Sequence, residues 1–387
     1  MKSIVVRVSV ALLAVAALWA ESPRKSEKPL RDEAPPISAA VDKGANWLAS
    51  VQGANGGWGQ DGGGTSRVGT GENLEPNGNS GSDVANTAVA ALALLQAGKQ
   101  YQPNVERAIA FILQRVEASP TDGLAVTDTK GTQIQRKLGP YIDTFLTSML
   151  LAQADGTLST RAQNARVRQG LEKCVAKIQQ NQKSDGSWNI AGGWAPVLGT
   201  SLASRSLFEA QQKGVAVERR VMARADDYTV NAMKSSADSG RAGGVAGGLG
   251  GGVGSGSGGG TPSAATADSA GVDLYQSAQA LEQLSHTDED RKKNANEISA
   301  IRSKLADSRF VAGFGSIGGE EFFSYLNLSD GMKRAGGEEW NQWHAKITKK
   351  IVDLQNNDGT WAGHHCITGR VAVTSAAILN LTVNRAD

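Results

Sequence analysis

Three short segments of the chain share the pattern Q-x-x-[N/D]-G-x-W: Gln52-Gly-Ala-Asn-Gly-Gly-Trp58, Gln182-Lys-Ser-Asp-Gly-Ser-Trp188 and Gln355-Asn-Asn-Asp-Gly-Thr-Trp361. Each copy follows apolar residues that recur at helical spacing, such as Ala45, Leu48 and Val51 before the first copy. An Asn-Gly or Asp-Gly pair after such a run ends the helix, because glycine accepts the left-handed conformation of a helix C-terminus. The pattern therefore predicts a repeated unit in which a helix runs into a glycine turn.

A second signature lies downstream of each expected turn, where a small residue is followed seven positions later by leucine on the same helix face. The pairs are Thr87 with Leu94, Thr144 with Leu151, Thr200 with Leu207, Leu274 with Leu281, Thr374 with Leu381, and a sixth, Ser324, whose partner is Gly331. Several of these second helices are followed by a glycine suited to a left-handed cap, namely Gly98, Gly156, Gly214 and Gly336. The sequence thus predicts about six helical hairpins and almost no strand.

The two helices of each hairpin differ in composition. The second helices are rich in Ala, Ser, Thr and Leu, which suits burial on both faces, whereas the first helices carry more Lys, Arg and Glu. We expect first helices near residues 41–52, 104–116, 163–182, 219–234, 294–306 and 341–355. The contrast predicts an all-α fold with an inner barrel of second helices and an outer layer of first helices.

The repeated segments resemble the QW motifs of squalene and hopene cyclases and the related repeats of protein prenyltransferase β subunits. Trp47, Gln52 and Trp58 fit the family pattern best, and Gln182 with Trp188 and Gln355 with Trp361 fit its second half. The resemblance covers roughly residues 40–384 and implies an αα-toroid with the second helices inside. It also implies that these Gln and Trp residues fasten one repeat to the next. The D-x-D-D acid motif of hopene-type cyclases and the Asp-x-Cys zinc motif of farnesyltransferases are absent from the sequence.

The composition limits the function in one respect. Lys and Arg number 40 against 38 Asp and Glu, and no long basic stretch occurs, so nothing indicates a nucleic-acid partner.

The N-terminus has the order of a secretory signal peptide, with Lys2 and Arg7 before an apolar run that ends at Ala20. The run is too short to span a bilayer, so we expect cleavage and export to the periplasm or the extracellular space, with no stable transmembrane segment afterwards. The alternative is a retained anchor. The expected domains are a signal peptide (1–20), a flexible linker (21–37) and the toroid (38–387), which contains a disordered Gly-rich loop (241–263).

The densest group of metal-ligand types is His364-His365-Cys366, at the expected start of the sixth inner helix. Imidazole and thiolate suit zinc, with Glu321 at a neighbouring helix start as a candidate carboxylate ligand. Adjacent residues on a helix point apart, so at most two of the three could share one metal ion. The alternative is a hydrogen-bonding cluster beside a small buried cysteine.

Other polar and aromatic residues lie near the starts of inner helices and are candidates for contact with an apolar ligand: Tyr141, Asp143, Tyr275, Phe323, Tyr325 and Arg370. The alternative for the aromatic residues is ordinary packing between helices. Asp83 and Asp143 are also expected to cap their helices, and His286 and His344 are expected at the surface.

Three functions stay open. The first is binding or transformation of an isoprenoid or other apolar molecule in the toroid, which predicts a deep cavity lined by aromatic residues. The second is a non-catalytic exported binding or interaction scaffold, which predicts a plugged or shallow centre. The third is a polysaccharide-active barrel, which requires paired carboxylates at one mouth. Fold analogy alone does not choose among them, nor does it decide whether the chain is an enzyme.

Overall fold

The computed structural model describes residues 35–61, 81–188, 196–242, 270–306, 319–363 and 367–385. The chain divides into a short unit, Met1–Asp32, and one large unit, Glu33–Asp387, to which all the helices below belong. The predicted signal peptide, most of the predicted linker and nearly all of the Gly-rich loop lie outside the described residues. Within the described ranges, no helix combines the length and the apolar character that a bilayer crossing requires.

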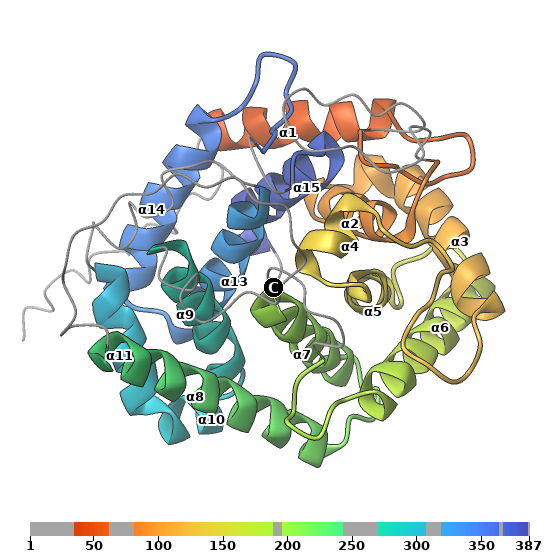
Figure 1. The fold of residues 1–387 in the computed structure, drawn as a ribbon. Helices are drawn as coiled ribbons and strands as arrows, with labels where there is room; N and C mark the ends of the chain where they lie inside the picture. The colour runs from red at the N-terminus through yellow and green to blue at the C-terminus, as the bar shows by residue number, and fades with distance from the viewer. Residues whose placement is uncertain are drawn as a thin grey trace, which may run out of the picture. The chain divides into compact units, whose positions relative to one another are not determined.

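The helices of the large unit form two concentric layers (Figure 1). The inner layer consists of α2 (Val84–Ala97), α5 (Ile142–Ala154), α7 (Pro196–Gln212), α9 (Ala270–Leu284), α13 (Gly319–Ala335) and α15 (Arg370–Leu381). The outer layer consists of α1 (Pro35–Ser50), α3 (Gln102–Ala118), α6 (Arg161–Gln180), α8 (Arg219–Ala242), α10 (Asp288–Lys293), α11 (Ala295–Ala306) and α14 (Glu338–Asp353). Each inner helix packs against the next one along the chain, and α15 packs against α2, so the inner layer is a closed ring.

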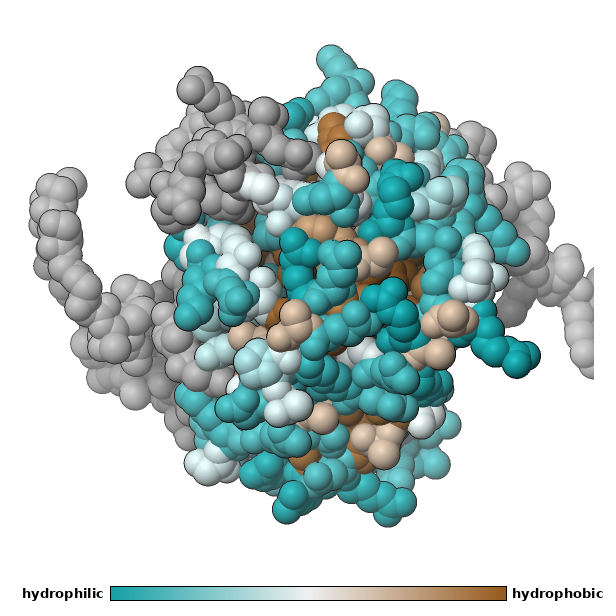
Figure 2. All heavy atoms as spheres, turned by 90° about the vertical axis from the view of Figure 1, so that its right-hand side faces the viewer, coloured by the Kyte–Doolittle hydropathy of each residue, from teal (hydrophilic) through white to brown (hydrophobic). Residues whose placement is uncertain are grey.

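The burial of the helices follows their composition. Nearly every residue of α2 and α5 is buried, because alanine, serine and threonine allow close approach on all sides. The outer helices bury only one face; α3, for example, buries Val105, Ile109, Ile112 and Val116. Figure 2 views the side where α3 and α6 lie, and this wall is mainly hydrophilic. The all-α toroid of about six hairpins that the sequence predicts is confirmed.

Two helices were not anticipated from the repeat. The short helix α10 precedes α11 in the fifth unit, and Asn294 separates the two. Helix α4 (Gln133–Leu138) lies between the second outer helix and the second inner helix, where the Q-to-W motif is missing. It begins with a capping box formed by Thr132 and Gln135 and packs on α2, α5 and α7. Helix α4 therefore occupies the place of a lost turn.

The three intact motifs make the same contacts. The indole nitrogens of Trp58, Trp188 and Trp361 donate to carbonyl oxygens at the end of the preceding outer helix, at 2.7–2.8 Å. Their backbone N–H groups donate to the threonine of the second signature, which is Thr87, Thr200 or Thr374. The Trp side chains are buried, so each contributes a large apolar surface as well as these hydrogen bonds.

The motif glutamines join neighbouring repeats. The Nε2 atoms of Gln52, Gln182 and Gln355 each donate to a carbonyl of their own turn and to one on the next outer helix. The acceptor for Gln355 is Ala40 of α1, so the last motif fastens the end of the ring to its beginning. Trp47 is partly buried on α1, beneath the guanidinium of Arg370, which lies 5.1 Å from its ring centre.

Glycine is required in these turns for two reasons. Gly186 has φ +91°, and a Cβ there would lie 2.0 Å from the carbonyl oxygen of Arg224 on the next outer helix. Gly56 and Gly359 have the same conformation and the same close approach to Arg107 and Lys43. The Gly of the motif therefore sets the distance between repeats as well as ending a helix.

Candidate functional site

The centre of the ring is bridged by side chains from helices that are not neighbours. Asn327 on α13 donates through Nδ2 to Ser201 Oγ on α7 at 3.2 Å, although α9 lies between these helices in the ring. Nearer the C-terminal ends of the same two helices, Arg205 forms an ion pair with Asp330. The hydrogen bond and the ion pair thus cross the centre of the ring at two levels along α7 and α13.

The inner faces of the described helices are polar where they are buried. Thr147 and Ser148 on α5, Ser204 on α7 and Asn327 on α13 each carry a buried side-chain atom without a hydrogen-bond partner among the described groups. Small hydroxyl and amide side chains of this kind do not form an aromatic chamber. Polar groups are therefore buried in the described inner layer of the ring.

A cavity of about 900 Å³ opens where the inner helices end, and we call it the mouth cavity. Its wall comes from the C-terminal ends of α2, α5, α7 and α13, together with Val383 in the 3-10 helix η4 (Val383–Arg385). The Arg205–Asp330 pair belongs to this wall. A smaller hollow of about 440 Å³ lies on the outer wall beside α11 and involves no inner-face residue of the lumen. The mouth cavity has the size of a small-molecule site.

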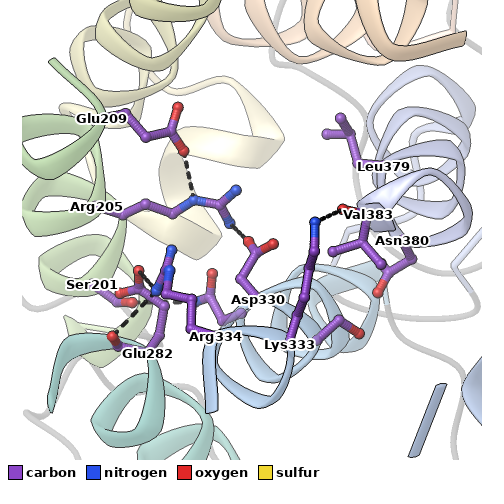
Figure 3. A network of polar contacts seen from close by, with 12 residues as sticks. Ser201, Arg205, Glu209, Glu282, Asp330, Lys333, Arg334, Leu379, Asn380 and Val383 are labelled. Atoms are coloured by element: carbon purple, nitrogen blue, oxygen red, sulfur yellow. Dashed lines mark hydrogen bonds and ion pairs between the residues drawn. The ribbon is translucent and has the colours of Figure 1, made fainter. Parts of the chain in front are cut away.

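A network of charges lies beside the mouth cavity, and Figure 3 shows it at close range. Arg205 Nε donates to Glu209 Oε1 at 2.8 Å, and its guanidinium also pairs with Asp330. Burial by itself would lower the pKa of Arg205, but Asp330, Glu209 and Glu282 hold it above its usual value. In Figure 3, Asp330 lies between Arg205 and Lys333, whose Nζ donates to Val383 O at 3.1 Å.

A second branch of the network is centred on Glu282, which is fully buried on α9. Arg334 Nη1 lies 3.1 Å and His286 Nε2 lies 3.0 Å from Glu282 Oε1. Burial alone would raise the pKa of Glu282, but His286, Arg334 and Arg205 lower it to about 2. The carboxylate is therefore charged at all physiological pH values.

The expectation that His286 lies at the surface is wrong. Its side chain is buried, and its ring stacks on Phe208 with centroids 4.3 Å apart. Glu282 satisfies one ring nitrogen and Phe208 covers one face, so the residue can be accommodated in the interior. His344 is partly exposed and lies against Trp340.

The opposite end of the inner ring, where α2 and α5 begin, holds two buried carboxyl groups. Asp83 caps α2 and accepts from the backbone N–H and the side-chain amide of Asn86, both at 2.8 Å. Asp143 accepts from Ala85 N at 3.1 Å and from Gln135 Nε2 at 2.6 Å. Burial raises the pKa of Asp83 to about 6, and burial together with the charge of Asp83 raises the pKa of Asp143 to about 7.

Helix α4 covers this pair. Gln135 of α4 bonds Asp143 directly, and Gln133 bonds the segment before α15, where it donates to Thr368 Oγ1 and accepts from the N–H groups of Thr368 and Gly369 at 2.8–3.2 Å. Both glutamines are buried. The described residues therefore cover the N-terminal end of the ring at α2 and α5 and leave a cavity at the C-terminal end.

The structure distributes the predicted ligand-contact residues over separate places. Asp143 lies beneath α4, Tyr141 is partly buried beside the core, and Phe323 is buried on α13. Tyr325 packs against Trp343 of α14, and its hydroxyl accepts from Lys350 at 2.8 Å. Arg370 binds Asp61 Oδ1 at 2.7 Å at the junction of the first and last repeats. Tyr275 belongs to α9, but its side chain lies outside the described residues.

The predicted metal ligands are only partly described. His364, His365 and Cys366 lie outside the described residues, so the zinc hypothesis stays a prediction. Glu321 is buried on α13, and its charge acts on Tyr325 and Lys350 between the two layers. Within the described ranges no three His, Cys, Asp or Glu side chains gather as a metal site would require.

The mouth cavity was not predicted from the sequence. Part of its signal was available, because Arg205 and Glu282 are charged residues in the middle or last turns of helices that are expected to be buried on both faces. A buried charge must have a partner, and Asp330 on another helix is one of the partners of Arg205. The sequence could not say which helix supplies it, since α7 and α13 meet across the ring rather than along it.

Comparisons with known proteins agree with this fold. A family model described as the squalene-hopene cyclase C-terminal domain matches residues 30–129. A variant of the type II terpene cyclase MstE from Scytonema, in complex with its substrate geranylgeranyl dihydroxybenzoate, matches with a TM-score of 0.51 and 11% identity over 91% of this chain and 98% of that chain. Two further variants, one with that substrate and one with the product merosterolic acid A, each match at a TM-score of 0.38 and 11% identity over 91% of this chain and 97% of theirs.

No curated protein sequence matches the chain. The matched residues contain the first intact turn motif, and the structural likeness extends over nearly the whole toroid. The chain therefore shares the αα-toroid fold of the Scytonema cyclase, and its residues 30–129 match the squalene-hopene cyclase C-terminal domain.

Proposed function

We propose that this chain is an exported αα-toroid that binds a small molecule in the mouth cavity and does not cyclise isoprenoids. The main support for this proposal is the contact of α7 with α13 across the ring. Cyclisation of a polyene through carbocations needs a chamber that excludes water and presents aromatic faces to the cation. The described inner helices offer buried hydroxyls and amides, and α7 and α13 are bridged across the ring.

The sequence supports the same proposal. It lacks the D-x-D-D motif whose acid starts cyclisation in hopene-type cyclases. The apolar run after Lys2 and Arg7 supports export, which would take the chain away from cytosolic prenyl diphosphates. What this chain retains is the set of turn residues that hold the ring together.

Two neighbouring glutamines of α7 provide a matched test of the binding site. Both side chains are exposed, but Gln212 lines the mouth cavity and Gln211 does not. The purified chain and its Gln212→Trp and Gln211→Trp variants would be screened by thermal shift against a library of anionic, neutral and apolar metabolites. We expect at least one ligand to stabilise the native chain and the Gln211 variant but not the Gln212 variant. Equal behaviour of the two variants would remove the mouth cavity as the site.

A second candidate is transformation of an apolar or amphiphilic isoprenoid. The buried carboxyl of Asp143 favours it, because a pKa of about 7 leaves much of this group protonated and able to act as an acid. The Scytonema cyclase was studied with geranylgeranyl dihydroxybenzoate, so this compound and squalene are suitable substrates for the assay. A cyclised product from the native chain, absent with Asp143→Asn, would overturn the binding proposal.

A polysaccharide-active function has less support from the geometry. Glu209 and Asp330 are the carboxylates that line the mouth cavity, and both are paired with Arg205. Both carboxylates are held in ion pairs with one guanidinium, whereas a glycosidase needs one carboxyl as acid and a second as base or nucleophile on either side of the sugar.

A further inference from the structure

The side chains that line the mouth cavity have an excess of positive charge. Five are cationic, namely Lys99, Arg205, Lys213, Lys333 and Arg334, and two are anionic, namely Glu209 and Asp330. Part of this charge has a structural role, because cations are favourable at the C-terminal ends of helices. Arg205 pairs with both carboxylates, and Lys333 bonds a backbone carbonyl.

Arg334 pairs with Glu282, so three of the five cations have a described partner and two do not. Lys99 follows α2 and Lys213 follows α7, and both are exposed at the rim of the cavity. Among the described residues, no carboxylate pairs with either ammonium group. Helices α2 and α7 are both neighbours of α5 in the ring, so the two lysines approach the cavity from either side of the end of α5.

The wall between them is a continuous hydrogen-bonded chain. Gln96 Nε2 donates to Gln153 Oε1 at 2.9 Å, Gln153 Nε2 donates to Glu209 Oε2 at 3.1 Å, and Glu209 accepts from Arg205. This chain fixes side chains from α2, α5 and α7, and the Arg205–Asp330 pair continues it to α13. A wall that is already held in place loses little entropy when a ligand binds.

We infer that the mouth cavity binds a small organic anion with two or more carboxylate groups, an inference that rests on the proposed binding function. Two separated ammonium groups on the rim match two separated acidic groups. The volume of about 900 Å³ exceeds what a lone inorganic anion fills, so the ligand is of metabolite size. The glutamine amides on the wall suit hydroxyl or carbonyl groups between the acids.

Citrate tests the inference, with triethyl citrate as its neutral analogue and inorganic phosphate as a small anion. Isothermal titration of the full chain at low and at physiological salt gives the affinities. We expect citrate to bind, triethyl citrate not to bind, and phosphate to bind at least ten times more weakly than citrate. Binding of phosphate as tight as that of citrate would overturn the inference for a larger carboxylate ligand.

Matched double variants separate a site from a general effect of charge. Lys99→Ala/Lys213→Ala removes both rim ammonium groups, and Lys130→Ala/Lys292→Ala removes two exposed lysines that do not line the cavity. We expect the first pair to weaken citrate binding at least tenfold without lowering the melting temperature, and the second to leave the affinity unchanged. Equal weakening by both would reduce the effect to net charge and overturn the inference.

The experiments distinguish failure of the carboxylate inference from failure of the proposed binding function. If no carboxylate binds but another ligand is blocked by Gln212→Trp alone, the mouth cavity is a binding site and the anion inference is wrong. If citrate binds and its affinity is unchanged by Gln212→Trp, both the mouth cavity as the binding site and the carboxylate inference are wrong.

Discussion

The two ends of the inner ring hold their charges in opposite ways. At the N-terminal end, Asp83 and Asp143 are like charges buried together, and burial raises both pKa values towards neutrality. At the C-terminal end, the carboxylates are paired with arginines; the pKa of Glu282 falls to about 2, while burial raises the pKa of Asp330 despite its pairing with Arg205. The first end is covered by α4 and the second has the mouth cavity. The comparison teaches that one ring of similar helices can be covered by hydrogen bonds from α4 at one end and lined by paired charges at the other.

The largest effect is expected from the cation that holds the open end together. Arg205→Met would leave Glu209 and Asp330 without their shared partner, and breaking a buried ion pair in this way costs about 3–5 kcal/mol. Urea unfolding at pH 7 would measure the loss in free energy of unfolding. Arg220→Met is the control, because the pair of Arg220 with Glu218 is exposed and contributes little. Equal stability of the two variants would show that charge does not organise this end.

The next largest effect concerns the cover of the other end. Gln133→Ala would leave the N–H groups of Thr368 and Gly369 without an acceptor, and a buried donor left unpaired costs about 1–3 kcal/mol. We expect a loss of about 2–3 kcal/mol and faster hydrogen exchange in α4 and at the start of α15. Gln342→Ala on the exposed face of α14 serves as the control. If exchange speeds up elsewhere but not in α4, this helix is not held by Gln133.

The two ends also differ in how much of their structure could be predicted from the sequence. The toroid was predictable because each Q-to-W turn depends on local rules: a glycine with positive φ, a Trp indole that bonds the helix before it, and a Thr that follows at a fixed place. The N-cap role of Asp83 is local too, and it was expected. The contact of Asp143 with Gln135, and the cover formed by α4, depend on how a lost repeat is filled, which no periodicity records.

The mouth cavity was missed for the same physical reason. Arg205 and Asp330 are far apart in the chain and on helices that are not neighbours in the ring, so only the diameter of the closed barrel brings them together. That diameter results from close packing of small residues, for example at Gly331, where a Cβ would lie 3.0 Å from Leu281 Cγ. This contact also explains why the leucine of the second signature is absent from the fifth inner helix.

A pH titration tests the charged end. The folded pKa of Glu282, about 2, lies below the ordinary glutamate value of 4.5, so its contribution is present above pH 4.5 and is lost as the pH falls towards 2. Between pH 6 and pH 3 this group alone should remove about 2 kcal/mol from the free energy of unfolding. Glu282→Gln should be less stable at pH 6 and lose less on acidification, whereas Glu172→Gln on the exposed face of α6 should follow the native curve. An unchanged acid slope in the Glu282 variant would contradict the assignment.

The smallest effect has the opposite sign and belongs to the covered end. The folded pKa of Asp83, about 6, lies above the ordinary value of 3.8, so its stabilising contribution is present below pH 4 and is lost as the pH rises through 6. Asp83→Asn keeps a good N-cap, and its amide can donate to Asn86 Oδ1, which now lacks a partner. Relative to the native chain, this variant should therefore gain about 1 kcal/mol of stability between pH 5 and pH 8. It should also lower the pKa of Asp143, because the charge of Asp83 is one of the causes that raise it. A variant that loses stability in parallel with the native chain over this range would contradict the raised pKa of Asp83, and the contrast between the two ends would then lack one of its two buried acids.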